Sequence, residues 1–177
     1  FGENYVQEMT EKAGRLPKDI RWHFIGHLQS NKVKLIAPFV QLIHGVDSLK
    51  LLKEINKEAE KNNRVIDCLL QIHIAQEETK FGLDEEELDS ILKEVGDLKM
   101  ENVRVVGLMG MASFTGDMGK VKEEFRFLRK IFERLKAHDS RLTTLSMGMS
   151  SDYKIAIEEG SNMVRIGSLL FGEREKK

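Results

Sequence analysis

Cysteine is almost absent from this sequence, and its scarcity excludes a fold held together by disulfides. The single cysteine, Cys68, has no partner for an internal disulfide, and such low cysteine use fits a reducing compartment. Cys68 lies among Ile66, Leu69 and Leu70, which predicts a buried, unreactive thiol rather than a nucleophile. We therefore expect a cytoplasmic protein that is stabilised by an apolar core.

A surplus of basic charge is missing as well. The 177 residues include 28 Lys and Arg against 29 Asp and Glu, with a pI near 6.6. A nucleic-acid-binding domain typically has a pI above about 9, so we expect no nucleic-acid partner. No apolar run approaches the ~18 residues that span a bilayer, so we expect no membrane insertion. The length predicts a single domain over residues 1–177.

The chain does contain an alternation of short β-branched runs with segments of helical period. Amphipathic stripes at Leu49–Ala59, Leu88–Val95 and Val121–Leu135 predict helices that cover a sheet, and Asp84 with Glu87 predicts a capping box before the second stripe. The candidate strands are Trp22–Ile25, Phe39–Ile43, Val65–Ile74, Val103–Met109, Thr143–Met147 and Met163–Ile166, with a fragment at Phe1–Glu3. This alternation predicts parallel βαβ units.

Such units build either an open doubly wound sheet or a closed (β/α)8 barrel. A barrel needs eight strands and about 200 residues at its lower limit. The sequence offers six candidate strands and one fragment, and it begins with Phe1 rather than Met. If the fold is a barrel, we expect its beginning to be missing.

Two loops near the C-terminus pair glycine with hydroxyl side chains. The run Thr143–Met147 leads into Gly148 and Ser150, and the run Met163–Ile166 leads into Gly167 and Ser168. Glycine lets a ligand approach the backbone, and hydroxyls with helix-start N–H groups favour phosphate, although turns use the same residues for capping alone. In barrels the last two strand–helix loops are the usual phosphate site.

Arg165 lies inside an apolar run, where a guanidinium needs a partner because it stays charged. Arg165 therefore either points to solvent, makes a structural ion pair, or contacts a ligand near the phosphate loops. His23 and His27 are four residues apart, but Phe24-Ile25-Gly26 disfavours the helix that would align them, so we predict no metal site. Walker loops, dinucleotide fingerprints and nucleophile elbows do not occur.

Five blocks of sequence, in order along the whole chain, resemble the pyridoxal phosphate homeostasis proteins. They are Phe1–Glu8, Trp22–Gly26 with Leu28–Lys32, Gly107–Met109, Leu145–Asp152, and Val164–Ser168 with Phe171–Gly172. The resemblance implies a (β/α)8 TIM-type barrel of the alanine racemase N-terminal-domain kind, here lacking strand 1 and most of strand 2. It also implies that the chain binds pyridoxal 5'-phosphate (PLP) and serves its homeostasis without robust turnover.

The resemblance also assigns roles to residues around PLP. Ser150, Gly167 and Ser168 would hold the phosphate, and Arg165 would face the pyridine nitrogen. The residues around the ring or lining the pocket would be Asn4, His23, Ser146 and Met149. An arginine at the ring nitrogen opposes its protonation and weakens the electron sink, which favours holding PLP over broad amino-acid chemistry.

Two alternatives remain at this point, a PLP-dependent amino-acid racemase and an enzyme of sugar phosphates on the same barrel. In the family, the Schiff-base lysine lies upstream of the Phe-Gly-Glu-Asn block, and Lys12, Lys18 and Lys32 do not match its context. We therefore expect that lysine before Phe1, and no catalytic residue in this chain. A barrel without strand 1 would leave a gap in the sheet, and its exposed strand edges predict self-association.

Overall fold

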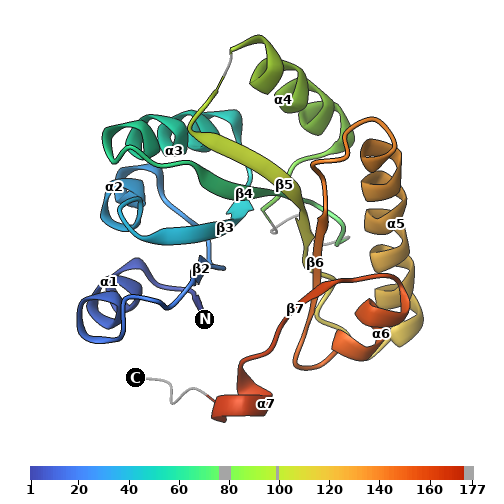
Figure 1. The fold of residues 1–177 in the computed structure, drawn as a ribbon. Coiled ribbons are helices and arrows are strands. Elements are labelled where there is room, and N and C mark those ends of the chain that lie inside the picture. The colour runs from blue at the N-terminus through green and yellow to red at the C-terminus, as the bar shows by residue number, and fades with distance from the viewer. Residues whose placement is uncertain (76–80, 99, 174–177) are drawn as a thin grey trace.

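The structure is a computed structural model that describes residues 1–75, 81–98 and 100–173, and its centre is one curved parallel sheet. Its strands are β1 (Gly2–Glu3), β2 (Trp22–Phe24), β3 (Val40–Val46), β4 (Ile66–Ile72), β5 (Val103–Gly110), β6 (Thr144–Met149) and β7 (Met163–Arg165). They pair in sequence order from β1 to β7, every pair parallel. Figure 1 shows the sheet curling round into a nearly closed barrel, which confirms the predicted fold class.

Helices cover the outside of this sheet (Figure 1). They are α1 (Val6–Arg15), the 3-10 turn η1 (Ser30–Lys32), α2 (Val33–Ile36), α3 (Leu49–Lys61), α4 (Glu85–Asp97), α5 (Met118–Lys136), α6 (Tyr153–Glu158) and α7 (Ser168–Phe171). The predicted capping box is confirmed at α4, where Asp84 and Glu87 each accept the other's backbone N–H. Within the described ranges, no helix is both long and apolar enough to cross a membrane.

Apolar side chains form two separate cores. The larger core lies between the sheet and the helices and includes Cys68. Burial raises the pKa of the Cys68 thiol, which is consistent with the predicted unreactive side chain. The smaller cluster consists of Leu42, Leu69, Val106 and Met109, with Met111 and Met163 packed against it. Side chains alternate between the two faces of a strand, so a residue two positions after a member of the smaller cluster lies on the same face of the sheet as that cluster.

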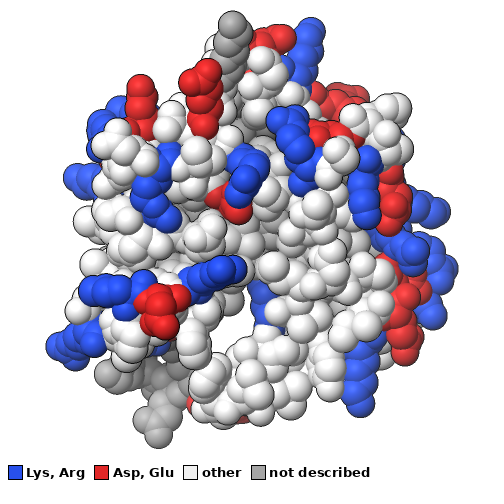
Figure 2. Space-filling view, viewed as in Figure 1, with Lys and Arg blue, Asp and Glu red and all other residues white. Residues whose placement is uncertain are grey.

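The sheet ends at β1 and β7, and within the described residues neither edge pairs with a further strand. This matches the expected gap between Phe1–Glu3 and Met163–Ile166. Figure 2, viewed as Figure 1, shows a hollow near the middle of the molecular surface. A basic side chain lies at the wall of the hollow, and most charged side chains lie around the periphery of the molecule.

Three strands extend beyond their predicted ends, and β5 does so by a single residue, to Gly110. β3 continues from Ile43 to Val46, and β6 continues from Met147 to Met149, where Met149 pairs with Arg165. The extension of β6 passes through Gly148 at φ +96°, where an added Cβ would lie 2.5 Å from that of Ala156. Only glycine takes that conformation and that close contact easily, so Gly148 directs the chain toward Ser150.

Candidate functional site

The predicted phosphate loops meet at the C-terminal ends of β6 and β7. The Ser150 hydroxyl accepts the N–H groups of Gly167, at 3.3 Å, and Leu169, at 3.5 Å. The backbone at Gly167 and Ser168 is exposed, and a Cβ on Gly167 would meet nothing within 4 Å. Convergent amides, a hydroxyl and open space are what a phosphate group requires.

Arg165 extends from β7 to two neighbouring strands. Its Nη1 donates to the Ser146 carbonyl oxygen at 3.1 Å and to Ser146 Oγ at 2.8 Å, and its Nη2 donates to the Gly110 carbonyl oxygen at 3.1 Å. Loss of solvent lowers the pKa of the guanidinium to about 10, and the charge of Asp152 acts in the opposite direction. Arg165 therefore remains a fixed cation at neutral pH.

Ser146 continues this contact to two histidines. Its Oγ lies 3.2 Å from Nδ1 of His44, and Nε2 of His44 lies 3.2 Å from Nδ1 of His23. Burial, followed by the charges of Arg165 and His23, lowers the pKa of His44 to about 3. Burial is also the largest cause that lowers the pKa of His23. His44 is therefore neutral at neutral pH.

These polar side chains lie on the strand face of the smaller core. His44 comes two residues after Leu42 on β3, and Arg165 comes two residues after Met163 on β7. His44 was not among the predicted site residues. The alternation from Leu42 could have indicated it, but the predicted strand stopped at Ile43, one residue before it.

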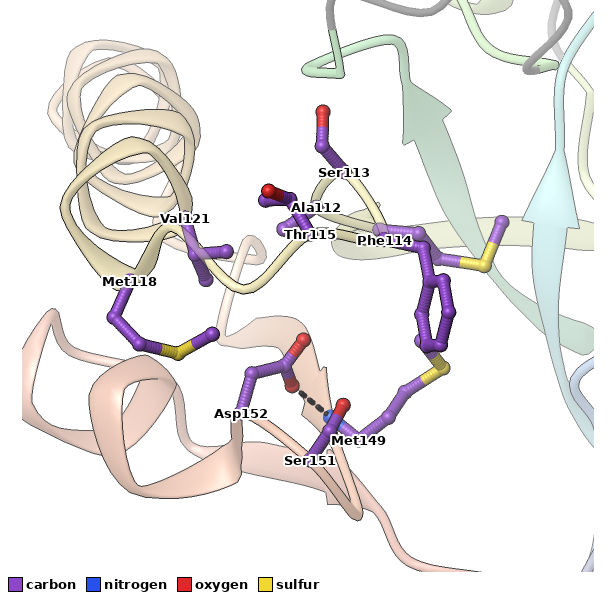
Figure 3. Close-up of a pocket in the computed structure, with 10 residues that line it drawn as sticks. Ala112, Ser113, Phe114, Thr115, Met118, Val121, Met149, Ser151 and Asp152 are labelled. Carbon is purple, nitrogen blue, oxygen red and sulfur yellow. Dashed lines mark hydrogen bonds between the residues drawn. The ribbon is translucent and has the colours of Figure 1, made fainter.

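Met149 lines a cavity of about 240 Å³ beside the phosphate loops (Figure 3). The cavity lies between the β5–α5 and β6–α6 connections, and the Phe114 ring lies beside the Met149 side chain. The Asp152 carboxylate forms part of its wall and accepts the Met149 N–H at 2.6 Å. This bond fixes the start of the turn that carries Ser150.

Asn4 lies apart from the other predicted residues. It follows β1 at the sheet edge and is exposed, and an added Cβ on Gly26 would lie 2.2 Å from its carbonyl oxygen. No hydrogen bond in the described part of the chain links the Asn4 side chain to His23 or Arg165. The structure thus brings together Ser146, Ser150, Arg165, Gly167 and Ser168, connects His23 to them through His44, and leaves Asn4 at the edge.

His27, which is four residues from His23 in sequence, is not part of this chain of polar contacts. Nδ1 of His27 is 3.3 Å from the Asp47 carboxylate, and its ring stacks on Phe81 at a centroid distance of 4.2 Å. Over residues 1–75, 81–98 and 100–173, no group of three His, Cys, Asp or Glu side chains is placed to hold a metal ion.

Comparison with known proteins shows which family the chain belongs to. The family described as alanine racemase, N-terminal domain, matches residues 1–175. A pyridoxal phosphate homeostasis protein of Aquifex aeolicus is 45% identical over 177 residues, which cover 99% of this chain and 77% of that protein. The chain belongs to the pyridoxal phosphate homeostasis protein family. A human pyridoxal phosphate homeostasis protein is 39% identical, with 99% of this chain and 68% of that protein covered.

A solved structure extends the family likeness to three dimensions. PipY of Synechococcus elongatus with PLP bound superposes with a TM-score of 0.85 at 33% identity, covering 97% of this chain and 81% of that one. The same protein without PLP gives a TM-score of 0.88. This member of the pyridoxal phosphate homeostasis family therefore shares its barrel with a relative that has been seen with PLP.

Proposed function

We propose that this chain binds PLP and takes part in PLP homeostasis, holding PLP without robust turnover. One observation carries the proposal. The amides at Gly167 and Leu169 converge with Ser150 at the barrel mouth, while Arg165, two residues before Gly167, presents a fixed cation inside the barrel. A ligand with a phosphate at one end and a polar ring at the other fits this arrangement.

The residues fit PLP in their chemistry as well as their placement. Gly167, Ser168 and Ser150 would hold the phosphate, and Arg165 would face the ring nitrogen with Ser146 and Met149 nearby. Bound PLP supplies an electron sink, which works best with a protonated ring nitrogen. The Arg165 cation opposes that protonation, so it favours holding over turnover. The names of the relatives do not favour the racemase alternative.

Other parts of the proposal concern location and extent. The single cysteine favours a cytoplasmic protein, and we propose that residues 1–177 form one binding domain.

Replacing Ser150 with alanine tests the phosphate cradle. We expect the affinity for inorganic phosphate and for pyridoxine 5'-phosphate, which lacks the aldehyde, to fall about 2- to 12-fold, the value of one hydrogen bond. Ser151→Ala is the matched control, because Ser151 is the exposed neighbour and, among the described residues, accepts neither the Gly167 nor the Leu169 N–H. Isothermal titration measures both affinities. Equal losses in the two variants, or a phosphate located on another loop after soaking with PLP, would refute this assignment.

Self-association through the sheet edges is the second testable part. The α7 side chains Leu169, Leu170 and Phe171 are largely exposed beside the β7 edge. Unpaired strand edges and exposed apolar side chains both promote association. We expect the sedimentation coefficient to rise with protein concentration, and Leu170→Glu to reduce that rise. A concentration-independent monomer contradicts this expectation.

A further inference from the structure

Four side chains from four strands form a continuous chain of polar contacts inside the barrel. Arg165 on β7 contacts Ser146 on β6, Ser146 contacts His44 on β3, and His44 contacts His23 on β2. Ser146 and His44 are fully buried. Buried polar groups need partners for every donor they carry, so the direction of the hydrogen bonds can be worked out.

The Ser146 hydroxyl decides that direction. One lone pair of its oxygen accepts from Arg165, which cannot act as an acceptor. If Nδ1 of His44 also donated to this oxygen, the Ser146 proton would need a further acceptor. The described residues provide no other polar partner for Ser146 Oγ. The proton therefore goes to Nδ1 of His44, and the charge of Arg165 favours the same orientation because the serine dipole then points its oxygen at the cation.

The rest of the chain follows from this first bond. His44 accepts at Nδ1 and must carry its own proton on Nε2, since burial and the neighbouring cation hold it neutral. Its Nε2–H then donates to Nδ1 of His23, which leaves the proton of neutral His23 on Nε2.

We infer that His44 is a positioning residue that joins Arg165 and Ser146 to His23 in one polarised hydrogen-bond chain, fixing the guanidinium and selecting the Nε2–H tautomer of His23. Each hydrogen bond is then donated in the direction away from the Arg165 cation: Ser146 donates to His44, and His44 donates to His23. The role in binding rests on the proposed function. His23 becomes a donor, which suits a ligand whose ring carries an acceptor oxygen.

Nitrogen NMR tests the chain without any ligand. In ¹⁵N-labelled protein at pH 7.5, we expect Nδ1 of His44 and His23 to show the shifts of unprotonated nitrogen, and both Nε2 atoms those of N–H. Ser146→Ala should shift His44 away from this single tautomer, and His44→Leu should do so for His23. Gln71→Leu is the matched control, a buried polar side chain on β4 that bonds Phe81 instead. A protonated Nδ1 on His44 in the unaltered protein would overturn the inference.

Ligand binding tests the positioning role. We expect His44→Leu to weaken pyridoxine 5'-phosphate about tenfold and inorganic phosphate by less than about twofold, because the phosphate loops stay intact. His44→Asn, which retains a group for Ser146, should restore part of the loss. Combined with Arg165→Lys, His44→Leu should add little, because both act on one guanidinium. Additive losses, or an equal loss in Gln71→Leu, would refute positioning. Failure of the unaltered protein to bind pyridoxine 5'-phosphate would refute the proposed function while the NMR result stands.

Discussion

Replacing Arg165 with methionine should weaken pyridoxine 5'-phosphate binding by about 10- to 100-fold, the equivalent of about 1.4–2.8 kcal/mol. Methionine keeps the length and much of the volume of arginine but removes the cation that we place at the ring. The loops at Ser150 and Gly167 are untouched, so inorganic phosphate should bind nearly as before. Fluorescence titration with both ligands measures the difference.

Stability should fall in the same variant. Arg165 donates to the Ser146 and Gly110 carbonyl oxygens and to Ser146 Oγ, and removing these donors leaves buried acceptors unpaired, at about 1–3 kcal/mol. Arg104→Met is the matched control, since Arg104 also lies on a strand but pairs with Asp67 at an exposed position. Exposed pairs contribute up to about 1 kcal/mol. If both variants lose ligand affinity equally, Arg165 does not face the ring.

Borohydride reduction with PLP should leave no single dominant modified lysine in this chain. PLP forms imines with amines, and selection of one lysine requires an amine held near the aldehyde while the phosphate is bound. Every lysine in the described ranges lies on a helix or in the segment after α1, and none lies on a strand. Lys12 is held by Glu3, and Lys18 by the Ala13 carbonyl oxygen.

Peptide mass mapping after reduction measures this distribution. We expect weak labelling shared among exposed lysines such as Lys57 and Lys130, and we expect excess pyridoxine 5'-phosphate to leave it unchanged, because those lysines lie outside the site. The Aquifex aeolicus relative, treated in parallel, should give one stoichiometric adduct if the family's lysine precedes the Phe-Gly-Glu-Asn block. One fully modified lysine in the present chain, protected by pyridoxine 5'-phosphate, would contradict the expectation that the Schiff-base lysine lies before Phe1.

Local patterns predicted most of the fold because they record burial directly. The stripe Val121–Leu135 became α5, and the capping residues Asp84 and Glu87 begin α4, since both signals depend on neighbours in sequence. Ser150 and Gly167 could be placed together because the C-terminal ends of neighbouring parallel strands share an edge.

His44 could not be found in the same way. Its contact with Ser146 spans 102 positions in sequence, and no local pattern carries that information. The predicted strand followed the apolar run and ended at Ile43, before His44 and before Gly45, a residue type depleted in strands. Pairing with β4, where Val46 lies opposite Leu70, overrides that preference and extends the strand to Val46.

Gly148 has a consequence for attempts to move this phosphate site into another protein. Glycine takes its left-handed backbone at no steric cost, and the missing Cβ lets it lie close against the Ala156 side chain, which belongs to α6. Ser150 is therefore aimed by a strand and a helix together rather than by the residues of its own turn. A graft of residues 148–152 alone onto a different barrel would carry the hydroxyl but lose its direction, whereas residues 144–169 also carry α6 and the Gly167 and Leu169 amides of the site.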